Sequence, residues 1–262
     1  MLHLLKQRKI NVIGLLETKL NESALDTIIQ RGFSGMGMAH NFHFCDRGRI
    51  LLLWDSQLVD LEILMATDQL IHCRLRCIVT GKRVLVTFVY GLHSIVTRRP
   101  LWRSLAELGE DITEAWMIMG DFNAILSVHD KVGGQPVSNY ELQDLEQLVQ
   151  GCGLVDLESI GCRLTWTNGM VSCKFNRALV NSHWLMADLN GYVEFLPPGC
   201  LSDHSCCMVS LLECEPRVQR RFLFYNITCG PCMMGTKNWL RTHGRNRFLA
   251  RINLFSKANW SD

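Results

Sequence analysis

The sequence predicts an α/β protein in which β-strands and helices alternate along one chain. The clearest sign is residues 116–119, Trp-Met-Ile-Met, an apolar run of strand length that stops at Gly120. Such runs are typical of strands that are covered on both faces in the middle of a sheet. The second sign is a helical spacing of apolar residues over 99–110 and 140–150, on either side of this run. Nearly half of the residues are apolar and a fifth are charged, which is a globular composition.

The N-terminal half is predicted to consist mostly of strands. Residues 2–9 resemble the end of a helix, and residues 10–16 form an apolar strand that closes on Glu17. Asn21 is placed to cap a helix that extends to Gln30. Turn-sized gaps then separate four strands, the last two of which are joined by a tight hairpin at 80–82. These four predicted strands span residues 50–54, 58–65, 70–80 and 83–90.

The second half mixes helices with shorter strands. The helix over 99–110 is amphipathic, and Pro100 lies in its first turn, where proline is tolerated. The helix over 140–150 carries a stripe of leucine and valine, and Asn168-Gly169 marks a hairpin turn. The remaining predicted strands span residues 154–157, 164–167, 173–180, 192–196 and 201–212.

The pattern of strands stops after Pro216, which predicts a domain over residues 1–215 and a basic appendage over residues 216–262. The appendage holds nine Lys or Arg residues and one acid, a net charge of +8, whereas residues 1–215 hold 18 basic and 24 acidic residues, a net charge of −6. A basic segment on an acidic body suits contact with a polyanion such as nucleic acid. A solvated chain end explains the same run of charges.

Several classes of protein are excluded by the sequence pattern. No apolar run is long enough to cross a bilayer, and Lys6 and Arg8 interrupt the N-terminal apolar stretch too early for a signal peptide. The twelve cysteines are scattered irregularly, as buried reduced thiols of an intracellular protein are. Cys229-Gly-Pro-Cys232 has the spacing of a redox pair but lacks the strand–motif–helix context of one.

Polar residues that can carry chemistry recur at the ends of four predicted strands: Glu17, Tyr90, Asp121 with Asn123, and Asp203 with His204. The residues beyond the carboxyl ends of strands are where α/β proteins usually place their sites. Carboxylate oxygens such as those of Glu17 and Asp203 are the ligands that Mg²⁺ or Mn²⁺ prefers. A histidine, an acid and a tyrosine can manage protons and the charge of a phosphate. Asp121 and Asn123 lie two apart, so in an extended segment they would share a face.

Each of these residues also has a purely structural explanation. Gly, Asp and Asn are ordinary turn formers, so residues 120–123 could simply end a strand. Glu17 could be a surface acid, and Tyr90 a packing residue with its hydroxyl in water. Asp203 could be a local cap beside a histidine at a turn. The repetition at like positions is what favours a shared site.

Three of these motifs together resemble the endonuclease/exonuclease/phosphatase superfamily, which includes the DNase-like nucleases. They are Glu17-Thr-Lys19, Gly120-Asp-Phe-Asn123 and Ser202-Asp-His204, in this order and at wide intervals. Over residues 1–212 the chain is most similar to the endonuclease domain of plant non-LTR (LINE-type) retrotransposons, and residues 216–262 resemble the connector before a reverse transcriptase. The segments that carry this second resemblance are Leu15-Leu-Glu-Thr-Lys19, Gly48-Arg-Ile-Leu-Leu-Leu-Trp54, Arg98-Arg-Pro-Leu-Trp102, Leu164-Thr-Trp-Thr-Asn168 and Arg177-Ala-Leu-Val-Asn-Ser-His-Trp184.

The resemblance implies a four-layer sandwich of two mixed sheets packed face to face with helices outside, and hydrolysis of DNA phosphodiester bonds inside the cell, in the nucleus. It also implies one role for each residue: Glu17 and Asp203 hold Mg²⁺ or Mn²⁺, Asp121 activates the attacking water, Asn123 and Tyr90 contact the phosphate, and His204 stabilises the transition state. Arg177 and Trp166 are expected to contact the DNA backbone. A phosphatase or a sphingomyelinase on the same scaffold is a further alternative.

Two departures from the family pattern predict weak or absent activity. The family has an acid that supports the catalytic histidine, and here that position is Asn176. An amide carries no negative charge, and in the analogous serine-protease pair the change from Asp to Asn lowers turnover by about 10⁴. The chain also opens after the position of the family's first strand, which carries an Asn near the metal, and this predicts a sheet edge or gap beside residues 10–16. The alternative function is a catalytically dead retroelement remnant that at most binds nucleic acid non-specifically.

Overall fold

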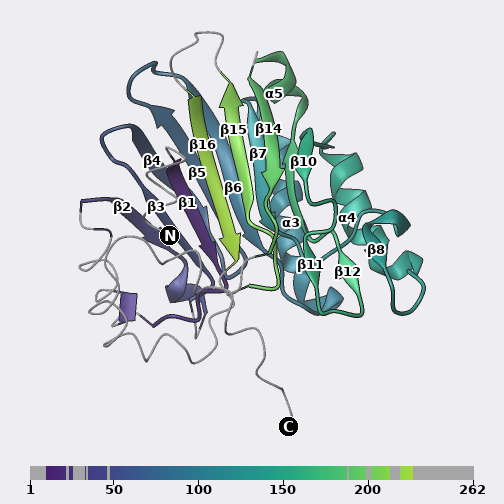
Figure 1. The fold of residues 1–262 in the computed structure, drawn as a ribbon. Helices are drawn as coiled ribbons and strands as arrows, with labels where there is room; N and C mark the ends of the chain where they lie inside the picture. The colour runs from purple at the N-terminus through teal and green to yellow at the C-terminus, as the bar shows by residue number, and fades with distance from the viewer. Residues whose placement is uncertain are drawn as a thin grey trace.

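Two large β-sheets packed face to face form the centre of the molecule (Figure 1). The computed structural model describes residues 10–21, 24–25, 33, 35–45, 48–187, 189–198, 202–212 and 219–226. The strands of the first sheet are β1 (Ile10–Leu16), β2 (Gly37–His40), β3 (Ile50–Trp54), β10 (Ser159–Gly161), β14 (Asn190–Phe195), β15 (Cys207–Leu212) and β16 (Gln219–Asn226). Those of the second are β4 (Val59–Ala66), β5 (Leu70–Cys77), β6 (Arg83–Tyr90), β7 (Trp116–Asp121), β9 (Val155–Asp156) and β13 (Asn176–Val180).

Both sheets are mixed. The seven-stranded sheet has the order β10-β14-β15-β16-β1-β3-β2, in which β1 runs parallel to β16 and β10 parallel to β14. The six-stranded sheet has the order β4-β5-β6-β7-β13-β9, in which only β6 and β7 are parallel. A small third sheet is formed by β8 (Lys131–Val132), β11 (Trp166–Thr167) and β12 (Ser172–Cys173). The helices whose bounds the described residues give are α3 (Ile95–Asp111), α4 (Asn139–Gly151), α5 (Ser182–Met186), η1 (Phe42–Phe44) and η2 (Val128–Asp130).

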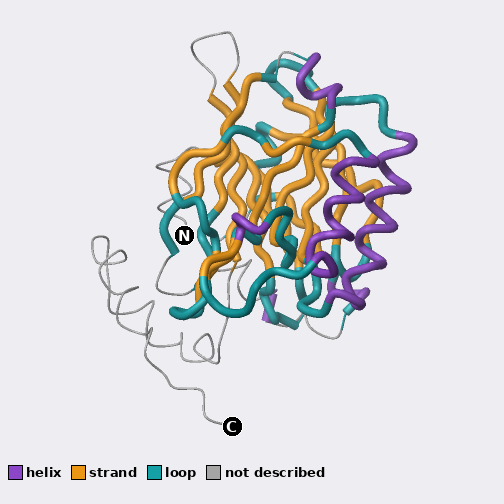
Figure 2. The backbone as a smooth tube through the Cα atoms, turned by 90° about the vertical axis from the view of Figure 1, so that its right-hand side faces the viewer, coloured by secondary structure: helices purple, strands orange, loops and turns teal. Residues whose placement is uncertain are grey.

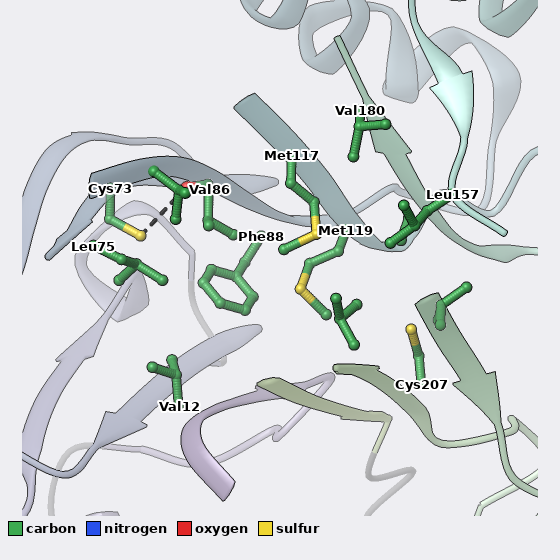
Figure 3. Close-up of a cluster of buried hydrophobic side chains, with 14 of the residues drawn as sticks. Val12, Cys73, Leu75, Val86, Phe88, Met117, Met119, Leu157, Val180 and Cys207 are labelled. Carbon is green, nitrogen blue, oxygen red and sulfur yellow. Dashed lines mark hydrogen bonds between the residues drawn. The ribbon is translucent and has the colours of Figure 1, made fainter. Parts of the chain in front are cut away.

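The main core lies between the two sheets. Figure 3 shows side chains from both sheets meeting there, among them Val12 and Cys207 from one sheet and Phe88, Met117 and Met119 from the other. All five are fully buried, so each contributes on the order of 1.5–3 kcal/mol of transfer free energy, and less for the cysteine. A strand that is buried on both faces, such as β7, has a nearly continuous apolar sequence.

Further apolar clusters cover the outer faces, which completes four layers. Helices α3 and α4 lie side by side on the outer face of the six-stranded sheet (Figure 2), where Leu105 and Leu145 pack on Trp116. On the outer face of the seven-stranded sheet, Leu25 and Phe42 pack in another cluster. This arrangement confirms the predicted fold class of two mixed sheets with helices outside.

Several predicted elements agree with the structure and others do not. The strands predicted over 164–167 and 201–212 are shorter in the structure, since β11 begins at Trp166 and β15 begins at Cys207, and β2, β10 and α5 were not predicted. The predicted strands over 10–16, 50–54 and 83–90 match β1, β3 and β6 residue for residue. The predicted strand over 173–180 is divided into β12 and β13, because the chain leaves the small sheet and enters the six-stranded one. Residues 2–9, most of the helix predicted up to Gln30 and residues 227–262 lie outside the described part of the chain.

Helix α3 starts one turn earlier than predicted, so Pro100 is inside the helix and not in its first turn. The structure shows a local side-chain contact here that the sequence pattern does not reveal. The guanidinium of Arg98 is buried, and its Nη1 donates to the carbonyls of Leu92 and His93 at 2.9 and 2.8 Å. These bonds fix the turn before the proline in helical geometry.

The prediction that the strands stop after Pro216 is wrong. Strand β16 pairs with β15 on one side and with β1 on the other, inside the seven-stranded sheet (Figure 1). Its residues 222–225, Phe-Leu-Phe-Tyr, form the continuous apolar run of a central strand, although they lie in the segment that was predicted to be a basic appendage. The predicted edge or gap beside residues 10–16 is therefore also wrong, because β1 has a partner on each side.

Two further observations bear on the excluded classes. None of the helices in the described residues is long and apolar enough to cross a membrane. Cys73 and Cys207 are free thiols, and burial raises the pKa of both, which keeps them protonated and unreactive. Cys229 and Cys232 lie outside the described residues.

Candidate active site

Three polar residues are brought to one edge of the six-stranded sheet by strand register. Strands β6 and β7 run parallel, and Tyr90 at the end of β6 pairs with Asp121 at the end of β7. On the other side of β7, Asn176 of β13 is also paired with Asp121. All three residues are buried. Parallel strands end at the same edge of a sheet, which explains why residues far apart in sequence meet here.

Asp121 and Asn123 meet through a tight turn and not through an extended strand, as sequence analysis had expected. Asn123 has a left-handed backbone with φ 47°, and its backbone N–H donates to Asp121 Oδ1 at 2.9 Å. Its side-chain Nδ2 donates to the Gly91 carbonyl at 2.7 Å and to Asp121 Oδ2 at 3.4 Å. The carboxylate and the carboxamide are thus held together and oriented by the turn.

Glu17 comes to the same place from the seven-stranded sheet. It follows β1, and the next two residues are held by the Gly48 carbonyl, which accepts from Thr18 Oγ1 at 2.9 Å and from the Lys19 N–H at 2.8 Å. The Glu17 carboxylate lies close enough to Tyr90 for its negative charge to act on the phenol, and its Oε1 lies 3.0 Å from Lys19 Nζ. Burial and the negative charges of Glu17 and Asp121 raise the pKa of the Tyr90 phenol, so the hydroxyl stays protonated.

Backbone strain is concentrated at these residues. Among the described non-glycine residues, those with positive φ are Glu17 (51°), Lys19 (52°) and Asn123 (47°). Two of the three are predicted site residues and the third pairs with Glu17. Each such conformation costs of order 1–3 kcal/mol and persists only where the surroundings enforce it, which is typical of functional sites. The strain therefore supports a site at this edge, independently of the motifs.

His204 links the two sheets from the other side. It is buried just before β15, its Nδ1 lies 2.9 Å from Asn176 Oδ1, and its Nε2 lies 3.6 Å from Asp121 Oδ2. Asn176 Nδ2 donates to the Ser205 carbonyl at 3.1 Å, which sets the orientation of the amide. Asn176 Oδ1 is then an acceptor, so the proton of the imidazole is on Nδ1 and Nε2 faces Asp121. Asn176 thus orients the imidazole without adding a negative charge.

Asp203 and Trp166 lie at the outer side of the site. Asp203 is exposed, and its Oδ2 accepts a hydrogen bond of 2.7 Å from Trp166 Nε1. The half-buried Trp166 ring lies 6.5 Å from the His204 ring, and the two residues form a backbone bridge between the small sheet and the seven-stranded one. This contact places Trp166 at the border of the site, with part of its surface in solvent.

Arg177 does not lie on the surface, so the prediction that it contacts DNA is wrong. Its side chain is 1% exposed and forms ion pairs with Asp130 and Asp156. It lies on β13 opposite Gly120, on the strand next to the site. A buried guanidinium between two carboxylates holds loops together and has no surface to offer to a phosphate.

Sequence analysis missed two residues that position the site. Thr165 is fully buried, and its Oγ1 accepts from the N–H groups of Phe175 and Asn176 at 2.9 and 2.8 Å. Arg98 holds the loop after Tyr90, and burial lowers the pKa of its guanidinium while the nearby Asp121 charge opposes that shift. Both lie in segments that carried the family resemblance, which was the only signal for them.

The carboxylates at this edge are compatible with a metal ion that has only one or two protein ligands. No group of three or more His, Cys, Asp and Glu side chains in the described residues is arranged to hold a metal. Mg²⁺ is usually bound by one or two carboxylates together with water and substrate phosphates, and not by a cage of protein ligands. Glu17, 14% exposed and a hard oxygen donor, fits that manner of binding.

Comparisons with known proteins agree with this reading of the fold. Residues 1–204 match the model of the Endonuclease/Exonuclease/phosphatase family. No curated protein matches. Among solved structures, the endonuclease domain of TRAS1, a telomere-specific non-LTR retrotransposon, matches with a TM-score of 0.53 and 12% identity over 76% of this chain and 96% of that one.

Two bacterial structures match equally well. The mannosyl-6-phosphatase Bt3783 of Bacteroides thetaiotaomicron has a TM-score of 0.55 and 15% identity over 81% of this chain and 89% of that one. A conserved protein of unknown function from Enterococcus faecalis has a TM-score of 0.55 and 16% identity over 80% and 88%. At sequence identities of 12–16%, these similarities show a shared fold and nothing further.

Proposed function

Because the chain belongs to the Endonuclease/Exonuclease/phosphatase family, we propose that it is the endonuclease domain of a non-LTR retrotransposon of the plant LINE type, with DNA as its substrate. Its reaction is the hydrolysis of a phosphodiester bond. The wide sequence resemblance to such domains supports this proposal, as does the similarity in fold to the TRAS1 endonuclease domain.

The observation that carries the proposal is the convergence of five predicted site residues: Glu17, Tyr90, Asp121, Asn123 and His204. The charges of Glu17 and Asp121 both act on Tyr90, Asp121 Oδ2 lies 3.6 Å from His204 Nε2, and Asn123 is bonded to Asp121. Strands from both sheets supply these groups. A random set of strand-ending polar residues would not converge in this way, so we take them as the catalytic groups.

The proposed roles follow from the atoms that each group offers. The Asp121 carboxylate accepts a proton from the attacking water, and the protonated Tyr90 hydroxyl donates a hydrogen bond to a phosphate oxygen. Asn123 Nδ2 would donate to a second phosphate oxygen in place of its 3.4 Å contact with Asp121 Oδ2. When its imidazole is protonated, His204 stabilises the negative charge that develops on the phosphate in the transition state. Trp166, at the border of the site, stacks on or packs against the nucleic acid.

Enzymes of this family generally depend on a divalent metal ion. We propose Mg²⁺ or Mn²⁺, held by Glu17 with Asp203 as a second carboxylate. When bound, the metal ion would neutralise part of the negative charge of the phosphate. The chain itself orients Glu17 for this purpose through Thr18, Lys19 and the Gly48 carbonyl.

Asn176 limits the activity. Its oxygen lies where the family's acid would contact the imidazole, at 2.9 Å from His204 Nδ1, but it does not favour the charged imidazole. We therefore propose slow hydrolysis or none, with a non-catalytic remnant that binds nucleic acid as the alternative. We further propose a nuclear location and a reverse transcriptase domain in the parent polyprotein, on the resemblance of residues 216–262 to the connector that precedes one.

The experiment that tests this function is nicking of supercoiled plasmid by Asn176→Asp, with Mg²⁺ and with a chelator. A carboxylate at this position restores the charge opposite His204, so we expect a gain of at least about tenfold over the parent chain, with about 10⁴ as the upper limit. Its second oxygen would face the Ser205 carbonyl, so the variant should also be less stable, by about 1–3 kcal/mol.

Two controls separate catalysis from other effects. Asp121→Asn in the Asn176→Asp background should abolish nicking. Asn181→Asp introduces an acid at another buried asparagine, which accepts from the Trp116 N–H at the far end of β7, and should leave nicking unchanged. A folded Asn176→Asp chain that does not nick DNA would contradict the endonuclease proposal, and a parent chain that nicks as fast would contradict the role of Asn176.

A further inference from the structure

The seven-stranded sheet is closed in its middle by the most C-terminal strand that the structure describes. Strand β16 lies between β15 and β1 (Figure 1), antiparallel to β15 from Cys207↔Phe224 to Leu212↔Gln219 and parallel to β1 from Ile10↔Arg221 to Leu16↔Asn226. Strands β15 and β1 are not neighbours in the sheet. Within this sheet, β16 is therefore the connection between β10-β14-β15 and β1-β3-β2.

Each half of this sheet carries one part of the site. Glu17 directly follows β1, and His204 precedes β15 by three residues. The last pair between β16 and β1 is Asn226 with Leu16, the residue before Glu17, so β16 extends to the site edge. The distance between Glu17 and His204 thus depends on a strand that lies beyond residue 212.

We infer that residues 219–226 act as a donor strand, which docks between β1 and β15 and thereby positions Glu17 relative to His204. The docking itself is independent of the reaction, whereas its consequence for catalysis rests on the proposed function.

Without β16, the space between β1 and β15 would leave many backbone N–H and C=O groups without hydrogen-bond partners, at a large cost in free energy. Strands β1 and β15 are buried along most of their length, and each would lose the hydrogen-bond partners of one side. Buried N–H and C=O groups without partners cost about 1–3 kcal/mol each. An extended segment that adds to the two exposed strand edges restores these bonds, as in other cases of strand addition. The apolar run 222–225 matches a slot between two buried strands.

A disulfide between neighbouring strands tests the docking in the full-length chain. In the register of β15 and β16, position 224 lies opposite Cys207, a free and buried cysteine. Directly opposed residues of antiparallel strands have Cα atoms about 4.5–5.5 Å apart, within the range of a disulfide. We expect Phe224→Cys to form a bond to Cys207 on oxidation of the folded chain, identified by peptide mapping.

Arg221→Cys is the matched control, because position 221 lies opposite Ser210 and three residues from position 224. It should give no bond to Cys207. Failure of Phe224→Cys to form the bond in the folded chain, or an equal yield from Arg221→Cys, would overturn the donor-strand assignment.

Amide hydrogen exchange tests the positioning role. Proline at position 223 removes an N–H and does not fit a central strand, so Leu223→Pro should expel β16. We expect amides of β1 and β15 to lose protection together, at least about tenfold, while those of β5 and β6 in the other sheet keep theirs. Unchanged protection in both β1 and β15 would contradict the inference. If the variant unfolds throughout, the disulfide result decides.

These readouts separate this inference from the proposed function. A chain that forms the bond between positions 207 and 224 but never nicks DNA, even as Asn176→Asp, has the donor strand and lacks the activity. A chain that nicks DNA without that bond has the activity and lacks the donor strand.

Discussion

The two large sheets differ in how far along the chain their neighbouring strands come from. In the six-stranded sheet, β4, β5, β6 and β7 are neighbours in the order of the sequence. In the seven-stranded sheet, β1 pairs with β16 across more than 200 residues of chain. The first kind of pairing is set by turns and short crossovers, whereas the second forms only when the rest of the fold has brought both ends together. The site lies where the two sheets meet, so it depends on both kinds.

The largest loss of stability should come from a substitution at Gly120 in β7, a central strand of the six-stranded sheet. Gly120 has φ +149°, and a Cβ there would lie 2.1 Å from the Val89 carbonyl oxygen on the neighbouring strand. Backbone atoms of paired strands cannot move apart cheaply, so Gly120→Ala should destabilise by more than about 5 kcal/mol, in the extreme tail of single substitutions. Denaturant unfolding measures this loss.

Gly81→Ala is the control in the same sheet, since Gly81 has φ +70° but no atom within 4 Å of the added Cβ. It should cost only the backbone strain, about 1–2 kcal/mol. Equal losses for the two variants would mean that the close approach of β6 and β7 is not what requires glycine at position 120.

The second largest effect should come from Arg177, between the six-stranded sheet and its loops. Arg177→Met leaves Asp130 and Asp156 without their buried partner, which should cost about 3–5 kcal/mol. Arg76→Met removes an exposed ion pair with Asp60 in the same sheet and should cost less than about 1 kcal/mol. A loss below 1 kcal/mol for Arg177→Met in thermal or denaturant unfolding would contradict its structural role.

His72 on β5 makes the six-stranded sheet sensitive to acid. Burial, with a smaller contribution from the Arg74 charge, lowers the pKa of His72 from 6.5 to about 4. As the pH falls, His72 takes up a proton in the unfolded chain before it does so in the folded one. The folded state therefore has its full stability above pH 6.5 and loses up to about 3 kcal/mol of unfolding free energy as the pH falls from 6.5 to 4.

Unfolding free energies of the parent and His72→Gln at pH 7, 5.5 and 4 check this sign. The parent should lose more stability than the variant between pH 6.5 and 4, because the glutamine does not titrate. Parallel curves for the two chains would show that His72 is not the group responsible.

The smallest effect should come from Asn41, which ties the sheets together away from the site. Its Oδ1 accepts from the Ile50 N–H of β3, and its Nδ2 donates to the Thr67 carbonyl before β5, both at 2.9 Å. Asn41→Ala should cost about 1–3 kcal/mol, since buried partners lose their bonds. Asn168→Ala, in the exposed Asn168-Gly169 turn, should cost less in the same unfolding assay.

The difference between the sheets also explains what could be predicted from the sequence. The strands 50–54 and 83–90 were predicted to the residue because apolar runs and turn residues are local signals. Strand β16 was missed, since a run of four apolar residues among arginines becomes a central strand only through β1 and β15. The same holds for Arg177, whose burial depends on two acids at remote positions.

In the site, the residue types were predictable and the connections were not. The motifs placed Glu17, Asp121 and His204 at strand ends, and the structure brings them to one edge. The hydrogen bond of Asn123 to Gly91 and the anchoring of Asn176 by Thr165 depend on a positive φ and on a loop from elsewhere in the chain. Periodicity carries no information about such contacts.

The central claim is that residues from the two sheets form one site, and a double-mutant cycle between His204 and Asn176 tests it most directly. The unfolding free energies of Asn176→Ala, His204→Ala and the double variant give the coupling of the two side chains. For a buried hydrogen bond of 2.9 Å across the sheets we expect a coupling of about 0.5–3 kcal/mol. Effects that add within about 0.3 kcal/mol would contradict the claim, because they would mean that the two side chains do not meet.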